Sequence, residues 1–381
     1  MASSPIRSRL SNAGNNLHSP GAYSLDEILS QPQCWSASLE DLEQEKKLHS
    51  VAKRFARATE WLFIGCGSSY YVALSAAAAM ERLTGLRSRA LPASEILLFP
   101  DLVSASAGNC VPVLISRSGQ TSEVVAAAQV LKTRGIPTLA ITCAGGQPLE
   151  EYASETILLS RADEKSTVMT RSFSSMLLTL QALAAVIVSD ARFLDSLSLM
   201  SQTVDHLLRT LPEKIRAFVS DHDFDDYVYL GQGPFYGIAC EGALKVTEMS
   251  VSYAQAFHTL EFRHGPKSIV GPETLLVFLL SESGYAAECE ALREMKSLGA
   301  ITLVVTNHTD APVRKASDLV VDLQLDVPEY ARLAPYLFVG QLLGLHTGLK
   351  KGLDPDSPRN LSRVVLLDDD MPRVKPEHAS I

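Results

Sequence analysis

Three charged residues that could move a proton lie in the segment from Cys240 to Ser268. Glu241, Lys245 and Glu248 are four and three positions apart, so on a helix they line one face. Charges at this spacing usually form a solvated helix face. Here the neighbouring residues are small or apolar, which favours a helix packed in a core. A carboxylate in a core needs a partner or a function, so this segment is our first candidate for a catalytic site.

A histidine follows in the same segment, directly before a glycine-proline pair. We expect the helix to end before Gly265-Pro266, because glycine is conformationally permissive and the residue before a proline is pushed away from the α region. His264 should therefore lie in a loop beside the basic residues Arg263 and Lys267. His258 and His264 are weak evidence for a metal site, and no metal is predicted.

Two turns rich in glycine and hydroxyl side chains follow apolar runs in the first half of the chain. Helix N-termini at such turns favour anions, and several hydroxyls with an arginine suit a phosphate monoester. Either turn alone is better explained by N-capping. Two turns at the carboxyl ends of neighbouring parallel strands, where α/β proteins bind ligands, favour a phosphate site. The candidate residues are Ser68 and Ser69 in one turn and Ser116, Arg117, Ser118 and Thr121 in the other.

The elements that must position these residues alternate between short apolar runs and longer helical patterns. This alternation is typical of parallel βαβ units, so the predicted fold class is α/β. Two helices precede the first strand, one after a capping-box pattern at Ser24 to Glu27 and one at about 38–59. The predicted elements of the first half are strands at 61–65, 111–116, 137–143 and 155–160 and helices at about 70–84, 121–134 and 174–188.

The second half of the chain repeats the landmarks of the first at a nearly constant spacing. Gly65 and Gly67 recur as Gly231 and Gly233, and Ser116 to Gly119 recurs as Ser281 to Gly284. We infer a duplicated α/β domain. In the second copy Glu282 would repel a phosphate, so we expect one functional site per chain. The first half would bind the phosphate, and the second would supply Glu248 and His264.

Composition excludes several classes of function. The chain has 381 residues, 46% of them hydrophobic, and a formal net charge of −9. The negative charge argues against a broad nucleic-acid-binding surface, and no run is long enough to span a membrane. The start of the chain lacks the apolar segment of a secretory signal, and the six scattered cysteines fit reduced thiols. We therefore predict a cytoplasmic protein.

Three common catalytic motifs fail at particular residues. Gly65 and Gly67 begin a dinucleotide-binding pattern, but Tyr70 takes the place of the third glycine. There is no G-x-x-x-x-G-K-[ST] phosphate loop, and Ser118 lies in no G-x-S-x-G elbow. A nicotinamide enzyme, an NTPase of that type and a serine hydrolase are therefore unsupported, and no cofactor is predicted.

Several motifs together resemble the sugar isomerase (SIS) domain family. They are the S-x-S-G-x-T turn, the E-G-A-L-K-x-x-E helix, the F-R-H-G-P-K-S turn and the late D-S-P-R-N-L, and the resemblance covers about Ser24 to Val365. The family includes the isomerase half of glucosamine-6-phosphate synthase and stand-alone tagatose-6-phosphate ketose/aldose isomerases, which are also viewed as galactosamine-6-phosphate deaminase/isomerases. The opening SLDEILSQPQCW and the EFRHGPKS turn look closer to the stand-alone type.

The resemblance implies two tandem SIS domains, each a three-layer αβα sandwich with a parallel flavodoxin-like sheet. We place an N-terminal arm and helix at 1–45, the phosphate-binding domain at 46–210, the second domain at 211–365 and a tail at 366–381. The resemblance also implies that Ser116, Arg117, Ser118 and Thr121 bind phosphate and that Ser68 and Ser69 contact the sugar. Glu248 matches the carboxylate that moves a proton between C1 and C2. His264 matches a ring-opening histidine supplied by the neighbouring subunit, which implies a homodimer with a shared site.

Two positions depart from the synthase pattern. Arg363 stands where the synthase has a lysine able to form a Schiff base, and an arginine stays protonated; Gln255 replaces a carboxylate. The catalytic candidates are therefore Glu248, His264 and Arg363. Because Arg363 cannot form a Schiff base, we expect the substrate to bring its own nitrogen, and we predict a deaminase/isomerase. It would convert a 2-amino-2-deoxyhexose 6-phosphate, preferably galactosamine 6-phosphate, to a ketose 6-phosphate and ammonia. The alternatives are a plain aldose–ketose isomerase, a deglycase of sugar-amine adducts, and a sugar-phosphate sensor without turnover.

Overall fold

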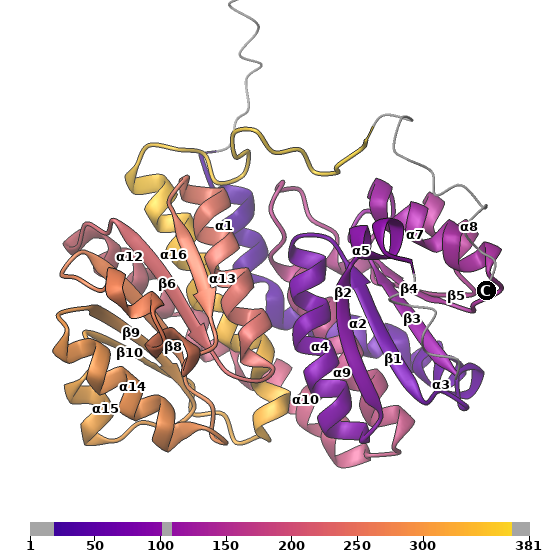
Figure 1. The fold of residues 1–381 in the computed structure, drawn as a ribbon, viewed down its shortest axis with the longest axis horizontal. Helices are drawn as coiled ribbons and strands as arrows, with labels where there is room; N and C mark the ends of the chain where they lie inside the picture. The colour runs from indigo at the N-terminus through magenta and orange to yellow at the C-terminus, as the bar shows by residue number, and fades with distance from the viewer. Residues whose placement is uncertain (1–18, 101–108, 368–381) are drawn as a thin grey trace, which may run out of the picture.

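The computed structural model describes residues 19–100 and 109–367, which form two five-stranded sheets with helices between and outside them (Figure 1). The strand orders are β2-β1-β3-β4-β5 and β7-β6-β8-β9-β10, and every pair is parallel. The second order repeats the first, which confirms the predicted α/β class and the two-domain duplication. Residues 1–18 of the predicted arm and 368–381 of the predicted tail lie outside the described residues.

The elements follow one another in the order expected of repeated βα units. The N-terminal part and first half contain α1 (Ala22–Leu29), α2 (Gln31–Gln44), α3 (Lys47–Arg54), β1 (Glu60–Gly65), α4 (Ser68–Thr84), β2 (Arg87–Pro92), α5 (Ala93–Leu98), β3 (Cys110–Ile115), α7 (Ser122–Thr133), β4 (Leu139–Thr142), α8 (Pro148–Tyr152), β5 (Glu155–Leu158), η1 (Ser160–Ala162), α9 (Arg171–Ile187), α10 (Ala191–Thr203) and α11 (Asp205–Leu208). The second half contains α12 (Leu211–Asp221), β6 (Asp226–Gly231), α13 (Phe235–Ser250), β7 (Ala254–Phe257), η2 (Glu261–Arg263), η3 (Pro266–Ile269), β8 (Thr274–Leu279), α14 (Tyr285–Ser297), β9 (Ile301–Thr306), α15 (Ala311–Lys315), β10 (Leu319–Asp322), η4 (Glu329–Arg332) and α16 (Leu333–Lys350).

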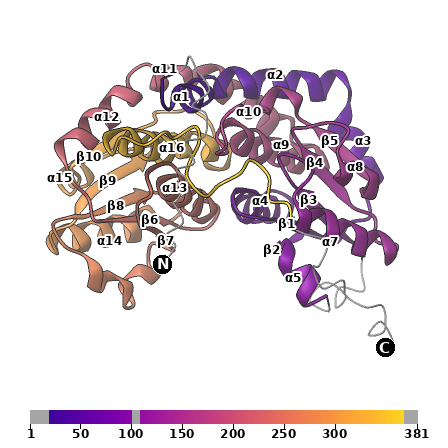
Figure 2. The ribbon, with the colours of Figure 1, turned by 90° about the horizontal axis from the view of Figure 1, so that it is seen from above.

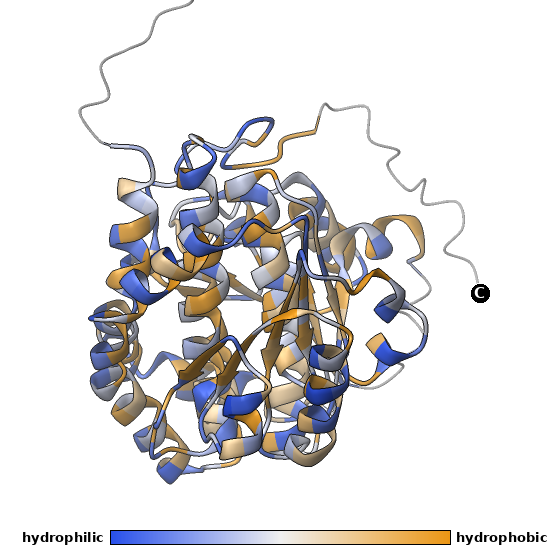
Figure 3. Ribbon diagram, turned by 90° about the vertical axis from the view of Figure 1, so that its left-hand side faces the viewer, coloured by the Kyte–Doolittle hydropathy of each residue, from blue (hydrophilic) through white to orange (hydrophobic). Residues whose placement is uncertain are grey.

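Each sheet is covered on both faces, so inner strands such as β1, β3, β8 and β9 are mainly apolar (Figure 3). Successive residues of a strand point to opposite faces. Trp61 and Phe63 of β1 therefore pack into a core shared by both halves, whereas Leu62 and Ile64 pack under α5, α7 and α8. The shared core contains residues of α4, α9, α13 and α16, which lie between the two sheets (Figure 2). The site-bearing helices α4 and α13 are thus buried in the middle of the molecule.

Glycines on α16 allow the backbone of α13 to approach closely. Gly340, Gly344 and Gly348 recur every fourth residue and so share one face of α16. A Cβ atom at Gly344 would lie 2.6 Å from the carbonyl oxygen of Lys245, and one at Gly348 would lie 2.2 Å from that of Met249. Only glycine fits these positions, because any side chain there would collide with the backbone of α13.

Several expected boundaries were wrong. The helix that carries Glu248 ends at Ser250 and not before Gly265-Pro266, because Val251 adopts a left-handed conformation and a short edge strand, β7, follows. The edge strand β2 was not predicted either. The expected helix at 38–59 is two helices, α2 and α3, and Ser24 lies inside α1 where its hydroxyl donates to Asp356. All six cysteines are free thiols, as predicted.

Replacing Gly348 by alanine should destabilise the protein by about 1–3 kcal/mol, because the added methyl group forces α13 and α16 apart. Urea unfolding followed by circular dichroism measures this difference. Gly271→Ala is the control, since a Cβ atom there meets nothing within 4 Å, and its cost should stay within about 0.5 kcal/mol. Equal stability of the two variants would contradict the packing described.

Candidate functional site

The predicted phosphate turn, Ser116 to Thr121, lies between β3 and the N-terminus of α7. The hydroxyls of Ser116 and Thr121 are 3.1 Å apart, and the backbone N–H groups of Gly119 and Gln120 each donate to a serine hydroxyl of the turn at 3.2 Å. Gly119 has φ +65°, and a Cβ atom there would lie 2.7 Å from Cβ of Gln147. The turn is thus a compact group of hydroxyls and N–H groups at a helix N-terminus, which favours an anion.

The second predicted turn lies beside the first at the same edge of the sheet. Ser68 and Ser69 begin α4 directly after β1, and β1 pairs with β3. The chain leaves β1 toward β2 on one side and leaves β3 toward β4 on the other. This reversal is the topological switch point at which doubly wound α/β sheets bind ligands. The structure therefore brings both predicted turns to the expected place.

Arg117 is buried, and its guanidinium is used within the protein. It donates to the carboxylate of Glu164 at 3.1 Å and to the carbonyl oxygens of Thr167, Val168 and Arg363 at 2.8–3.1 Å. Glu164 also accepts hydrogen bonds from the N-terminus of α9. In this structure the side chain of Arg117 ties the phosphate turn to the segments behind it. Sequence reasoning missed Glu164, because nothing in its local sequence marks it as the partner.

The segment after α16 crosses from the second half to the first and reaches the phosphate turn (Figure 1). The backbone N–H of Ser122 donates to the carbonyl of Val365 at 3.3 Å, and that of Leu367 donates to the hydroxyl of Ser122 at 3.0 Å. Arg363 forms an ion pair with Asp163, and its carbonyl accepts from Arg117. The crossing places Arg363 beside the predicted phosphate site although the two are far apart in the sequence.

A buried lysine joins the two halves at the centre of the molecule. Nζ of Lys245 lies 3.2 Å from Oε1 of Glu241, 2.5 Å from Oε2 of Glu248 and 3.3 Å from the hydroxyl of Ser68. Ser68 in turn donates to Glu241 at 3.0 Å. The side chains of Lys245 and Glu241 are fully buried, whereas that of Glu248 is 18% exposed. Of the two carboxylates, Glu248 is therefore the one that a ligand can reach.

Burial and neighbouring charges set the protonation of this cluster. Burial raises the pKa of Glu241 to about 8; Lys245 opposes the rise and the charge of Glu248 adds to it. Burial lowers the pKa of Lys245, but the two carboxylates outweigh it and raise the pKa above its usual value. A neutral Glu241 leaves one positive and one negative group in the cluster, and the charges balance. One oxygen of Glu241, Oε2, is buried without a hydrogen-bond partner.

His264 lies apart from this cluster, in the turn between η2 and η3, and is exposed. Its neighbours Arg263 and Lys267 each pair with Glu294 at 2.7 Å, which holds the turn on α14. Among the contacts of the described residues, none joins His264 to Glu248 or to either hydroxyl turn. A single chain thus presents the predicted histidine at its surface.

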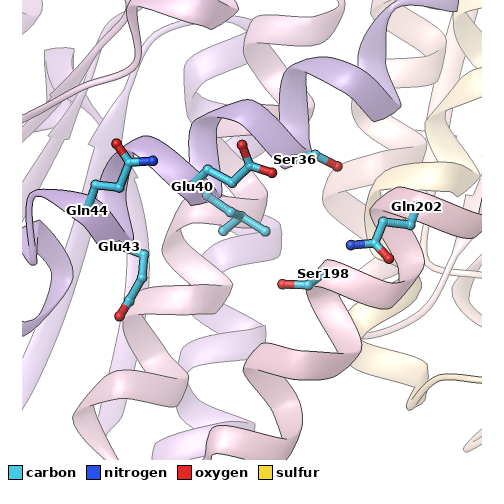
Figure 4. Close-up of a pocket in the computed structure, with 7 residues that line it drawn as sticks. Ser36, Glu40, Glu43, Gln44, Ser198 and Gln202 are labelled. Carbon is cyan, nitrogen blue, oxygen red and sulfur yellow. The ribbon is translucent and has the colours of Figure 1, made fainter.

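Other features of the described residues do not involve the predicted site. A cavity of about 380 Å³ between α2 and α10 is lined by Glu40, Glu43 and Gln202 among others (Figure 4), and none of the predicted site residues lines it.

Within 19–100 and 109–367, no three His, Cys, Asp or Glu side chains are grouped so that they could hold a metal ion. No helix in the same ranges has the length and apolarity needed to cross a membrane.

Comparison with known proteins gives consistent matches over nearly the whole chain. The sequence profile of the SIS domain matches residues 54–188 and 225–344. A glutamine–fructose-6-phosphate aminotransferase (isomerizing) from Pyrobaculum aerophilum is 28% identical over 362 residues, which cover 91% of this chain but only 58% of that relative.

Two solved structures share the fold. Glucosamine-6-phosphate deaminase from Thermotoga maritima superimposes with a TM-score of 0.75 at 29% identity, covering 91% of this chain and all of that one. Tagatose-6-phosphate ketose/aldose isomerase from Escherichia coli has a TM-score of 0.78 at 23% identity, covering 89% of this chain and 97% of that one.

Replacing Lys245 by methionine should destabilise the protein by about 3–5 kcal/mol, because the buried Glu241 and the partly buried Glu248 lose their counter-charge. The loss should be larger near pH ~8 than near pH ~5, since burial raises the pKa of Glu241 to about 8 and its carboxyl is neutral at the lower pH. Urea unfolding at the two pH values measures it.

Lys296→Met is the matched control. It breaks a partly exposed pair with Asp318 and should cost less than about 1 kcal/mol at either pH. A Lys245 variant as mild as this control would show that the carboxyl groups of α13 do not depend on this counter-charge.

Proposed function

The chain belongs to the SIS domain family, and from this membership we propose that it is an amino-sugar-phosphate deaminase/isomerase. Its substrate would be a 2-amino-2-deoxyhexose 6-phosphate, and its products a ketose 6-phosphate and ammonia. The proposal also includes a cytoplasmic homodimer with a site shared between subunits.

One observation carries the proposal: one of the two hydroxyl turns of the first half, at Ser68, meets the carboxylate helix of the second. Ser68 begins α4 beside the phosphate turn, and the same hydroxyl is bonded to Glu241 and Lys245 of α13. A sugar phosphate held by Ser116, Ser118 and Thr121 would thus extend toward Glu248. A phosphate anchor at one end and a reachable carboxylate at the other are what an aldose–ketose isomerisation requires.

The proposed steps use a single carboxylate as base and then as acid. After the sugar ring opens, Glu248 takes the proton from C2, the electron pair moves to the C1 aldehyde, and its oxygen gains a proton from solvent to give an enol that carries the amine. Return of the C2 proton from Glu248 to C1 leaves a protonated imine at C2, and the extra proton departs with the ammonia as ammonium. Water adds to that carbon and ammonia leaves, so one water is consumed for each ammonia released. Lys245, at 2.5 Å, holds the Glu248 carboxylate in place throughout.

The surroundings of Arg363 support a nitrogen supplied by the substrate. Its guanidinium is paired with Asp163, and an arginine remains protonated and cannot attack a carbonyl carbon. No Schiff base would form at this position, so the imine nitrogen would be the amine that the substrate brings. The Thermotoga maritima relative, a glucosamine-6-phosphate deaminase by name, supports the same class of reaction. The preference for the galactosamine compound rests only on sequence resemblance.

The direct test supplies purified protein with galactosamine 6-phosphate or glucosamine 6-phosphate and measures free ammonia and ketose 6-phosphate. We expect both products in equal amounts, faster from the galactosamine compound. Glu248→Gln should reduce the rate by at least about 100-fold, because an amide cannot carry the proton. Tight binding without ammonia from either sugar would favour a sensor. Turnover of tagatose or fructose 6-phosphate alone would favour a plain isomerase.

The shared-site proposal predicts complementation between two inactive variants. Glu248→Gln and His264→Asn chains should each be inactive alone, and mixing them should restore part of the activity, because a mixed dimer contains one site with both groups. Ammonia release after subunit exchange measures this. If labelled subunits exchange and activity stays absent, His264 serves its own chain or none.

A further inference from the structure

The second half contains a counterpart of the phosphate turn, and an anionic side chain of the protein already lies on it. The turn Ser281 to Gly284 follows β8, which holds the same place in its sheet as β3 in the first. The carboxylate of Glu329 accepts hydrogen bonds from the backbone N–H of Glu282 at 2.5 Å, that of Ser283 at 3.3 Å and the hydroxyl of Ser283 at 2.7 Å. These donors are the kind that bind a phosphate oxygen.

The corresponding turn of the first half differs in this respect. Among the described contacts, no carboxylate accepts a hydrogen bond from a backbone N–H or a hydroxyl of the residues Ser116 to Thr121; these groups bond to one another, and the carboxylate of Glu164 contacts only the Arg117 guanidinium behind the turn. The backbone motif is thus repeated, but an anion of the protein occupies only the second copy.

The second turn also has space beside it. A cavity of about 220 Å³ is lined by the turn after β6, the turn after β8 and the residues Glu329 and Tyr330. It therefore lies at the switch point of the second sheet, where the first sheet has its predicted phosphate site. The acidic residue of the turn, Glu282, forms an ion pair with the buried Arg332. Because Arg332 compensates the charge of Glu282, repulsion by Glu282 does not explain why this turn would reject a phosphate.

We propose that Glu329 is an internal anion that occupies the phosphate position of the second half and limits the chain to one phosphate site. The turn keeps the ability to bind a phosphate group, as inorganic phosphate or a phosphate monoester, and does so when the Glu329 carboxylate is removed. The proposal concerns a second site and does not depend on the reaction assigned to the first.

The test is equilibrium dialysis of the full chain against labelled inorganic phosphate. Glu329→Ala should bind one more phosphate per chain than the unmodified protein. Asp326→Ala is the matched control: it removes one exposed carboxylate of the same segment and should leave the number unchanged. Adding Ser283→Ala to Glu329→Ala should weaken the extra binding at least about 10-fold, because the turn loses its hydroxyl donor.

Glu329→Gln provides a second variant, which keeps the side-chain volume and removes only the charge, and thermal unfolding confirms that each variant is folded. It should also gain phosphate binding, more weakly than Glu329→Ala because the amide still fills part of the site. If both folded variants bind the same number of phosphates as Asp326→Ala, Glu329 only braces the turn and the proposal is wrong. An extra phosphate that persists undiminished after Ser283→Ala lies elsewhere and equally overturns it.

Discussion

The buried ammonium of Lys245 is the interaction on which the arrangement of the two halves depends. It lies on α13 of the second half and contacts Ser68 at the start of α4 in the first. Removing an ammonium from water is costly, and the cost is offset only where its carboxyl and hydroxyl partners meet it with good geometry. Sliding α4 along α13 would remove Ser68 from its hydrogen bonds with Glu241 and Lys245. The cluster therefore fixes the position of the Glu248 carboxylate relative to the hydroxyl turns.

We propose that the duplicated fold forms a single site, because its two copies differ at equivalent places. The first half keeps an open hydroxyl turn at its switch point, whereas the second places Glu329 on its own turn. The second half instead contributes α13, and its final segment returns over the first half and contacts Ser122. On this proposal neither half has all the parts of the site alone, and the two halves meet where Ser68 of α4 contacts Glu241 and Lys245 of α13.

Sequence patterns predicted the features that depend on local chemistry. Apolar runs followed by glycine and serine turns marked β1 and β3, and repeated landmarks marked the duplication. The edge strands β2 and β7 were missed because they are only half-buried and show no continuous apolar run. The end of α13 was missed because Val251, a residue that disfavours a left-handed conformation, adopts one. The partners of Arg117 and the contact of Glu329 with Ser283 join distant parts of the chain, and no local pattern identifies them.

The central claim is that the first half binds the phosphate while α13 of the second half performs the proton transfer. Calorimetric titration with galactosamine 6-phosphate of two variants, Ser118→Ala/Thr121→Ala and Glu248→Gln, separates these roles most directly. The account predicts that the double variant loses at least about 10-fold in affinity, since two donors to the phosphate are removed, and that Glu248→Gln binds the sugar phosphate nearly as tightly as the unmodified protein. Unchanged affinity in the folded double variant would contradict the account.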